Sequence, residues 1–136
     1  MNVVLLLTGS SLAPGVADEV RTRTGDPGAT VHIVAWRPLA SPVAGVGNLH
    51  VVGPASLPRP ASLPVRAARR LVRGGLSLQF WRRTRRDFAA MATIEQADVL
   101  VAVDTAAIRT GWHLARRLPA AQAVYGVAAV NSTVRG

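Results

Sequence analysis

Two short stretches of the sequence hold the side chains best suited to binding a ligand. The first, GSSLAPG, spans residues 9–15, and the second, Asp104 with Thr105, directly follows the apolar run DVLVAV. Free backbone amides and hydroxyl groups at the start of a helix can hold an anion, and ligands of parallel sheets bind at the carboxyl ends of strands. The candidate ligand-binding residues are Gly9, Ser10, Ser11, Gly15, Asp104 and Thr105.

Both stretches also have a structural interpretation, which the residue types favour. Glycine and proline within residues 9–15 make a turn without any ligand. Asp104 precedes a helical pattern, where an aspartate accepts hydrogen bonds from the free N–H groups of the first turn. We therefore expect Asp104 to cap a helix beside a crevice, and a ligand role is the alternative.

Other chemistries lack the residues that they need. The chain has neither cysteine nor lysine, which excludes disulfides, thiolate metal sites and the lysine of a phosphate-binding loop. Gly9 and Gly15 are spaced too widely for the dinucleotide fingerprint. His32, His50 and His113 are scattered over two predicted strands and a helix, so we interpret them as packed or surface histidines. We predict no catalytic residue, no metal site and no cofactor.

Apolar strands alternate with helical patterns along the chain. Continuous apolar or β-branched runs predict buried strands, at residues 2–8, 29–36, 48–53, 98–104 and 123–130. Helical patterns cover residues 15–25, 65–73, 76–96 and 105–119, with a break expected at Gly74-Gly75. This alternation predicts an α/β fold, a single Rossmann-like domain over residues 1–136. We expect a three-layer sandwich around a mostly parallel sheet of about five strands.

The predicted fold decides where a ligand would bind. If the strand order is 3-2-1-4-5, the winding reverses between the first strand and the strand that ends at Asp104. Ligand crevices of open α/β sheets lie at this reversal. The loop at residues 9–15 and Asp104 would then face each other across one crevice.

Charge is distributed unevenly along the chain. The sixteen basic residues are all arginines and stand against seven acidic residues, which gives a net charge of +9. Ten of these arginines lie between Asp26 and Asp87, where there is no acid, so the rest of the chain carries 6 − 7 = −1. Such asymmetry suggests an anionic partner.

An arginine-rich helical crossover, at about residues 64–96, concentrates this charge. The arginines share one side of each helical segment: Arg66, Arg69, Arg70 and Arg73, then Arg82, Arg83, Arg85 and Arg86. The opposite side of the second segment is predicted to be apolar, with Leu76, Phe80, Trp81, Phe88, Met91 and Ile94. A solvated outer face explains this periodicity. It does not explain eight arginines without an acid among them, since solvated faces normally mix signs.

Several partners fit such a face. Arginines with Phe and Trp close by can lie on an anionic membrane, and they can also bind the phosphates of nucleic acid. No base-reading motif is present, so sequence-specific nucleic-acid binding is not expected. The N-terminal MNVVLLLTG lacks a basic leader and its apolar run is short, which predicts a cytoplasmic protein, peripheral at a membrane if the face binds lipid. An open sheet edge makes a homo-oligomer a further expectation.

Four segments together resemble the N-terminal half of GT-B glycosyltransferases of the family-4 type. They are NVVLLLTGSS, the long basic crossover, ADVLVAVDTAAIRTGWHLARRL and QAVYGV, and they span most of the chain. The resemblance implies a Rossmann-like fold, an acceptor-side cleft near the first glycine loop, and a basic amphipathic region that contacts the membrane in many relatives. The chain departs from the family in VYGVAA, which lacks a histidine, and in lacking the donor-binding domain, so we do not expect independent glycosyl transfer.

Three hypotheses on function follow. The first is a stand-alone, non-catalytic interaction module whose arginine-rich crossover contacts an anionic surface or an acidic protein partner. The second is one half of a split glycosyltransferase, completed by a separate donor domain. The third is a small nucleotide-binding domain that uses residues 9–15 and Asp104.

Overall fold

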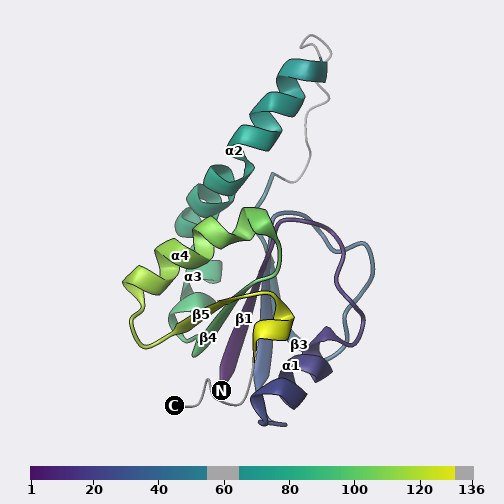
Figure 1. Cartoon of the computed structure of the whole chain (residues 1–136), viewed down its shortest axis with the longest axis vertical. Coiled ribbons are helices and arrows are strands. Elements are labelled where there is room, and N and C mark those ends of the chain that lie inside the picture. Colours follow the sequence, from purple (N-terminus) through teal and green to yellow (C-terminus); the bar gives the residue numbers. More distant parts are fainter. Residues whose placement is uncertain (55–64, 131–136) are drawn as a thin grey trace.

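Five strands form one sheet in which every neighbouring pair is parallel (Figure 1). The computed structural model describes residues 1–54 and 65–130, and only the backbone for residues 65–74. The strands are β1 (Asn2–Leu7), β2 (Thr30–Ala35), β3 (Val46–Val51), β4 (Val99–Ala102) and β5 (Gln122–Tyr125). The predicted α/β, Rossmann-like class is therefore confirmed, and the strand order is β3-β2-β1-β4-β5, the order assumed above in placing the crevice.

Helices cover both faces of the sheet and complete three layers. One face carries α1 (Val16–Thr24), and the other carries α2 (Val65–Arg86), α3 (Phe88–Glu95) and α4 (Ile108–Arg117). Short 3-10 turns, η1 (Thr105–Ala107) and η2 (Val127–Ala129), follow β4 and β5. The N-terminal strand lies in the middle of the sheet, which is why its apolar run is continuous.

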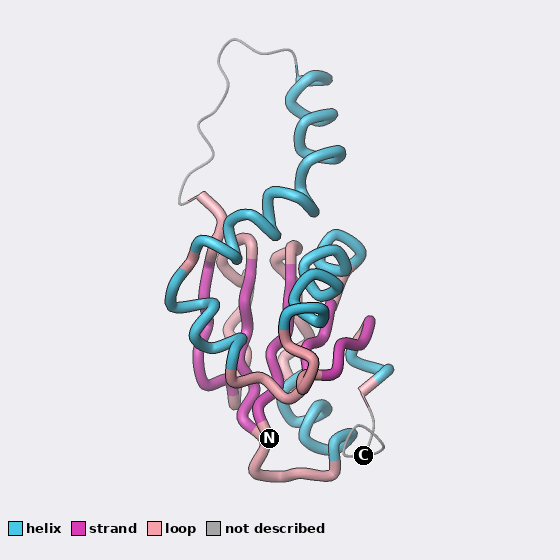
Figure 2. The backbone as a smooth tube through the Cα atoms, turned by 90° about the vertical axis from the view of Figure 1, so that its left-hand side faces the viewer, coloured by secondary structure: helices cyan, strands magenta, loops and turns pink. Residues whose placement is uncertain are grey.

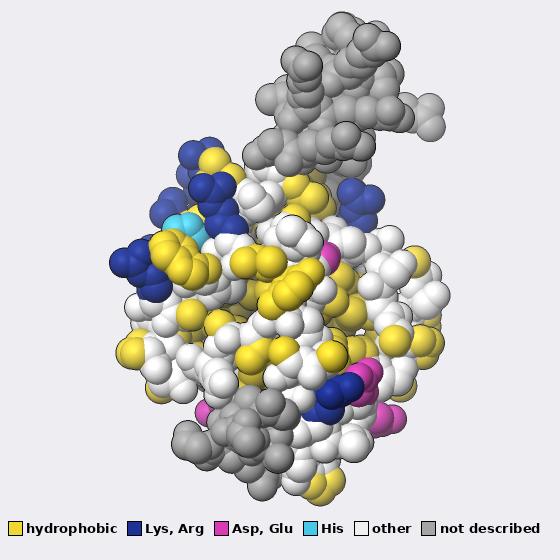
Figure 3. Space-filling model, in the orientation of Figure 1, with side chains coloured by type: hydrophobic (Ala, Val, Ile, Leu, Met, Phe, Trp, Pro, Cys, Tyr) yellow, Lys and Arg dark blue, Asp and Glu magenta, His cyan; other side chains and the backbone are white. Residues whose placement is uncertain are grey.

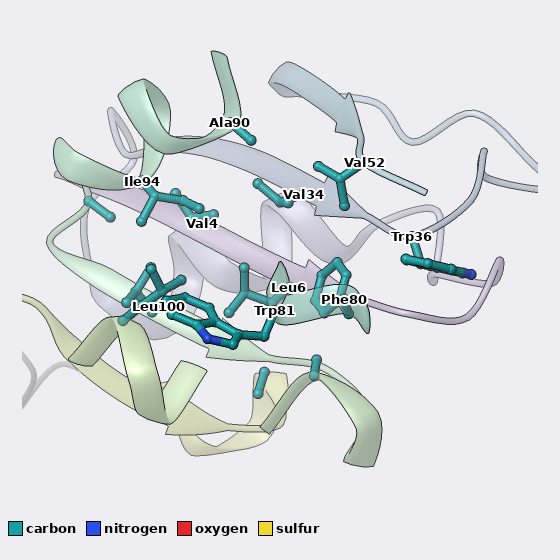
Figure 4. Close-up of a cluster of buried hydrophobic side chains, with 14 residues drawn as sticks. Val4, Leu6, Val34, Trp36, Val52, Phe80, Trp81, Ala90, Ile94 and Leu100 are labelled. Carbon is teal, nitrogen blue, oxygen red and sulfur yellow. The ribbon is translucent and has the colours of Figure 1, made fainter. Parts of the chain in front are cut away.

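The alternation of side chains along β1 divides the core into two halves. Val4 and Leu6 point toward α2, α3 and α4, whereas Val3 and Leu5 point toward α1. Figure 4 shows the first half, in which the sheet packs against Phe80 and Trp81 of α2, Ile94 of α3 and their neighbours. Complete burial of a Val, Leu or Phe side chain stabilises the fold by about 1.5–3 kcal/mol.

The ends of α1 follow the signals in its sequence. Asp18 and Glu19 lie in the first turn, where carboxylates complement the helix dipole. Gly25 ends the helix in the left-handed conformation, with φ of 70°, which glycine adopts without a steric penalty. The predicted helix at residues 15–25 is therefore confirmed to within one residue at each end.

The prediction of a helix break at Gly74-Gly75 is wrong. The helix α2 continues through both glycines to Arg86, and the chain breaks at Asp87 instead. Each glycine destabilises a helix by about 1 kcal/mol relative to alanine, which is small enough for the hydrogen bonds of the neighbouring turns to offset. Asp87 adopts an extended conformation, and its carboxylate accepts a hydrogen bond of 3.0 Å from the Ala90 N–H, which starts α3.

Two further predictions fail for related reasons. Phe88, assigned above to the apolar side, is 90% exposed, because the break at Asp87 changes the direction of the helix axis and so the phase of the side chains. The last strand ends at Tyr125 rather than at residue 130, since Gly126 turns the chain with φ of 80° into η2.

Helix α2 extends well past the carboxyl ends of the strands (Figure 2). The part that packs on the sheet is its C-terminal portion, where Phe80, Trp81 and Thr84 are buried. The packed portion begins at the carboxyl ends of the strands (Figure 1). Residues of α2 therefore lie at the same edge of the sheet as the loops after β1 and β4.

Candidate functional site

Asp104 joins the ends of β1 and β4 at the point where the winding of the sheet reverses. Its Oδ2 accepts hydrogen bonds from the N–H groups of Thr8, at 2.8 Å, and Gly9, at 2.9 Å. Its Oδ1 accepts from the Thr8 hydroxyl at 2.7 Å and from the Ala107 N–H at 3.2 Å. Asp104 is thus a helix cap, as expected, and it also holds the first loop against the fourth strand.

This network occupies the donors that a bound anion would use at the start of the first loop. The carboxylate of Asp104 takes the amide of Gly9 and both donors of Thr8, so it stands where an external anion would have to bind. An anionic ligand at this point would also meet the negative charge of Asp104 itself. We call Thr8, Gly9 and Asp104 the structural clasp, because their hydrogen bonds join the ends of β1 and β4. Fewer free donors remain for an anionic ligand than the sequence indicates.

The other candidate residues of the crevice lie around this clasp without converging on one point. Ser10 accepts a hydrogen bond of 2.8 Å at its backbone oxygen from the Ala40 N–H, and Ser11 is exposed. Thr105 is exposed at the first position of η1. Gly15 precedes α1 at the far end of the loop, and its carbonyl accepts the Glu19 N–H of the first turn.

The four arginines near the end of α2 face two different places. Arg82, Arg83 and Arg86 line a hollow beside Trp36, whereas Arg85 lies close enough to His113 of α4 to depress its pKa. All four side chains are exposed, and they face two different neighbours of α2. The side chains of Arg66, Arg69, Arg70 and Arg73 lie outside the described residues.

Aromatic and basic side chains of α2 and α4 form a second candidate site. The His113 ring stacks on the Trp81 ring with centroids 4.7 Å apart, and the Trp112 ring meets its edge at 5.1 Å. The guanidinium carbon of Arg116 lies 4.7 Å from the centre of the Trp112 ring, and that of Arg117 lies 5.2 Å from the centre of the Trp81 ring. Such cation–π contacts contribute about 0.5–1 kcal/mol at exposed sites.

We call this group the basic–aromatic surface. Its members are Trp81, Arg85, Arg109, Trp112, His113, Arg116 and Arg117. Figure 3 shows arginine side chains gathered around a histidine on the side of α4, whereas acidic side chains on this view lie mainly near α1. None of its four arginines takes part in an ion pair with any side chain that the structure describes.

The pKa of His113 reports the field at this surface. It is lowered from the usual 6.5, first by burial against its neighbours and then by the positive charges of Arg109, Arg116, Arg117 and Arg85. Four arginines thus act on one imidazole without a compensating carboxylate. The surface holds net positive charge that an anion would neutralise.

An apolar groove of about 210 Å³ lies between α4 and β5, next to the basic–aromatic surface. Its walls carry three large exposed side chains: Ile108 is 40% exposed, Trp112 is 54% exposed and Tyr125 is 56% exposed. Trp112 belongs both to the groove and to the basic–aromatic surface. Charge and exposed apolar area are therefore adjacent on one side of the molecule.

Sequence reasoning missed the contribution of α4 to this surface. It treated the arginines outside the crossover as balanced by acids, because Arg109, Arg116 and Arg117 were counted together with the acids of distant segments. A signal was present in the sequence: Arg109, Trp112 and Arg116 recur at helical spacing, and no acid follows Asp104. What the sequence does not show is that α4 packs beside α2.

Comparisons with known proteins identify no relative of this chain. A scan against models of protein families gives no match to the chain, and a search of curated proteins gives no significant similarity. The fold and the site therefore define a class, an α/β Rossmann-like domain with a basic–aromatic side, and the resemblance to GT-B glycosyltransferases stays a prediction.

No helix among the described residues has the length and apolar character required to cross a lipid bilayer. The same residues contain no group of three or more His, Asp or Glu side chains arranged to hold a metal ion. His32 on β2 accepts the Asn48 N–H at its Nδ1, at 3.0 Å, and His50 on β3 bonds to the Thr93 hydroxyl at 2.8 Å.

Proposed function

We propose that the protein is a non-catalytic, Rossmann-like interaction module that binds an anionic membrane surface through its basic–aromatic surface. One observation carries the proposal. Four arginines of α2 and α4 lie near His113, one of them over the Trp112 ring, with no acid paired to them among the described residues. The sheet and its remaining helices act as the rigid support that presents this surface.

The chemistry of the surface fits the interface of an anionic bilayer. Each arginine near such a surface contributes about 1 kcal/mol of attraction to the lipid headgroups. Tryptophan and tyrosine prefer the headgroup level, where their apolar rings and polar groups are both satisfied. Trp112 and Tyr125 are more than half exposed next to these arginines, so they can enter the interface without any change of the fold.

The same geometry argues for lipid over nucleic acid. A protein that holds single-stranded nucleic acid offers free aromatic faces on which bases stack. Here Arg116 covers one face of the Trp112 ring, and the other ring of the pair, Trp81, is 6% exposed and stacked on His113. An acidic protein partner remains an outcome that the experiment below separates.

The experiment is flotation of the purified protein with anionic and with neutral vesicles, at low and high salt, with duplex DNA as a competitor. We expect binding to anionic vesicles that salt weakens, since exposed charges are screened, and that DNA does not abolish. Loss of all vesicle binding in the presence of DNA would contradict the proposal and show that the protein binds any polyanion. Equal or absent binding to both kinds of vesicle would refute it and direct the search to an acidic protein.

A further inference from the structure

A hollow of about 320 Å³ lies between the ends of β2 and β3 and the side of α2, away from the basic–aromatic surface. We call it the arginine hollow, and it is lined by Trp36, Pro54, Gln79, Arg82, Arg83 and Arg86. Trp36 directly follows β2 and Pro54 follows β3, so the floor lies at the carboxyl edge of the sheet where ligands of such folds bind. Helix α2 supplies the remaining residues from two successive turns.

Three arginine residues line this small volume without a carboxylate among the lining residues. The side chains of Arg82, Arg83 and Arg86 form no hydrogen bond and no ion pair with any other residue that the structure describes. The nearest acid in sequence, Asp87, is turned to the start of α3, where it accepts the Ala90 N–H. The positive charges repel one another until an anion enters.

The floor of the hollow is rigid. Trp36 is 7% exposed and packs with Val52 and Phe80 at one end of the core cluster (Figure 4). Its backbone N–H donates to the Leu7 oxygen at 2.9 Å, and the Val52 N–H donates to the Ala35 oxygen at 2.8 Å. Gly53 lies so close that an added Cβ would overlap the carbonyl oxygen of Trp36. A ligand therefore meets a preformed floor and arginines that can adjust above it.

We propose that the arginine hollow binds a phosphate-bearing ligand of the size of a phosphate monoester or diphosphate. The guanidinium is planar and donates two parallel hydrogen bonds to phosphate oxygens, so three of them suit a multiply charged phosphate. Pockets for small ligands start at about 300 Å³, and the hollow is at this lower limit. Because the Trp36 ring is nearly buried, it offers little face for stacking, and the phosphate itself is the group recognised.

The test is a titration of the protein with inorganic pyrophosphate, followed by the indole N–H resonance of Trp36. We expect a saturable shift in the wild type and binding at least tenfold weaker in the double variant Arg82→Gln/Arg86→Gln. The double variant Arg109→Gln/Arg116→Gln removes the same charge from the other surface and should keep the affinity within twofold. Circular dichroism of each variant confirms that it is folded.

Two results would overturn the proposal. One is the absence of a saturable Trp36 shift in the folded wild-type protein. The other is equal weakening in both double variants, which would reduce the effect to net charge. Because the readout uses no vesicles, a failure here leaves the membrane proposal standing, and a failure of flotation leaves this one standing.

A second arm of the experiment separates the two sources of a phosphate. Vesicles with a phosphorylated inositol lipid are compared with phosphatidylserine vesicles of the same surface charge. A preference for the inositol lipid that Arg82→Gln/Arg86→Gln removes assigns the hollow to a lipid headgroup. Pyrophosphate binding without such a preference assigns it to a soluble phosphate, and both outcomes support a phosphate site.

Discussion

The two helical layers of this protein use arginine in opposite ways. On α1, Arg21 donates hydrogen bonds to the backbone oxygens of Ala29, at 2.9 Å, and Gly45, at 2.6 Å, and it pairs with Asp18. Arg23 pairs with Glu19 at 3.0 Å and reaches the Ala128 oxygen. On α2 and α4, the side chains of the arginines that the structure describes have no such partners and lie over aromatic rings, near His113 or around a hollow.

This difference separates structural charge from charge that is free to act. The arginines of α1 fasten loops to a helix, so their positive charge is already compensated. The arginines of α2 and α4 repel one another, which opposes folding slightly and favours any anion that approaches. Protein surfaces usually mix positive and negative side chains, and this one does not. We therefore expect a partner to bind here, next to the exposed Trp112.

The largest predicted effect contrasts two double variants that remove the same charge from opposite layers. Arg109→Gln/Arg116→Gln should weaken binding to anionic vesicles by roughly 30-fold, since each lost arginine costs about 1 kcal/mol at such a surface. Arg21→Gln/Arg23→Gln should change it by less than about threefold, because those side chains lie on the other layer. Flotation at fixed ionic strength measures both, and equal losses would show that net charge alone decides.

The next effect concerns the aromatic part of the surface. Trp112→Ala should weaken vesicle binding about tenfold, because transfer of some 60 Å² of apolar surface contributes about 1.5 kcal/mol. Phe88→Ala is the control, an exposed aromatic outside the basic–aromatic surface, and it should leave binding unchanged. The same flotation assay applies, and a larger loss for Phe88→Ala than for Trp112→Ala would place the contact elsewhere.

Stability should show the reverse order for the two arginine pairs. Arg21→Gln/Arg23→Gln should lower the free energy of unfolding by about 1 kcal/mol, because the exposed ion pairs and the bonds to Ala29 and Gly45 are lost. Arg109→Gln/Arg116→Gln should change it by less than about 0.5 kcal/mol, since the removal of like charges offsets the lost cation–π contact of Arg116 with Trp112. Urea unfolding of both variants measures this, and a greater loss in the second variant would show that those arginines support the fold.

The smallest effect is a pH dependence at His113. Its pKa is lowered in the folded protein, so the unfolded chain binds the proton first as the pH falls. The contribution of His113 to stability is therefore complete above about pH 6.5 and decreases as the pH falls below that value. The difference in urea stability between wild type and His113→Gln isolates it from His32, whose pKa is lowered in the same direction by burial and by His50.

A direct readout of the same prediction is the NMR titration of the His113 ring. The midpoint should lie below 6.5 in the wild type and should rise in Arg109→Gln/Arg116→Gln, because two of the four positive charges that depress it are gone. A midpoint that stays the same in the variant would show that Arg109 and Arg116 do not lower this pKa.

Much of the fold was predictable because buried parallel strands leave a strong mark on a sequence. The apolar runs that contain Val3 to Leu7 and Val99 to Ala102 lie in the central strand and in its neighbour β4, and both are buried on both faces. Asp104 was recognised as a cap from its place before a helix. Its bonds to Thr8 and Gly9 join residues about a hundred positions apart, and such contacts follow only from the sheet order.

The candidate site was less predictable because it depends on packing between helices. The direction of Arg85 differs from that of Arg82 and Arg86, and this follows from how α2 seats Phe80 and Trp81 on the sheet. The end of α2 is set by the extended backbone of Asp87. The sequence favours a break at Gly74-Gly75 instead, because glycine has a low helix propensity. The packing of α4 against α2 could not be predicted, because α3 and β4 separate these two helices in the sequence.

The most direct test of the central claim is to ask which layer of the molecule touches the bilayer. The fluorescence of Trp112 is measured on anionic vesicles that contain brominated lipids, with Trp112→Phe subtracted to remove the signals of Trp36 and Trp81. A second reporter is Thr22→Trp in the Trp112→Phe background, at an exposed position of α1. We predict a blue shift and quenching for Trp112 and neither change for the reporter at position 22. Quenching of the α1 reporter with Trp112 unaffected would contradict the account.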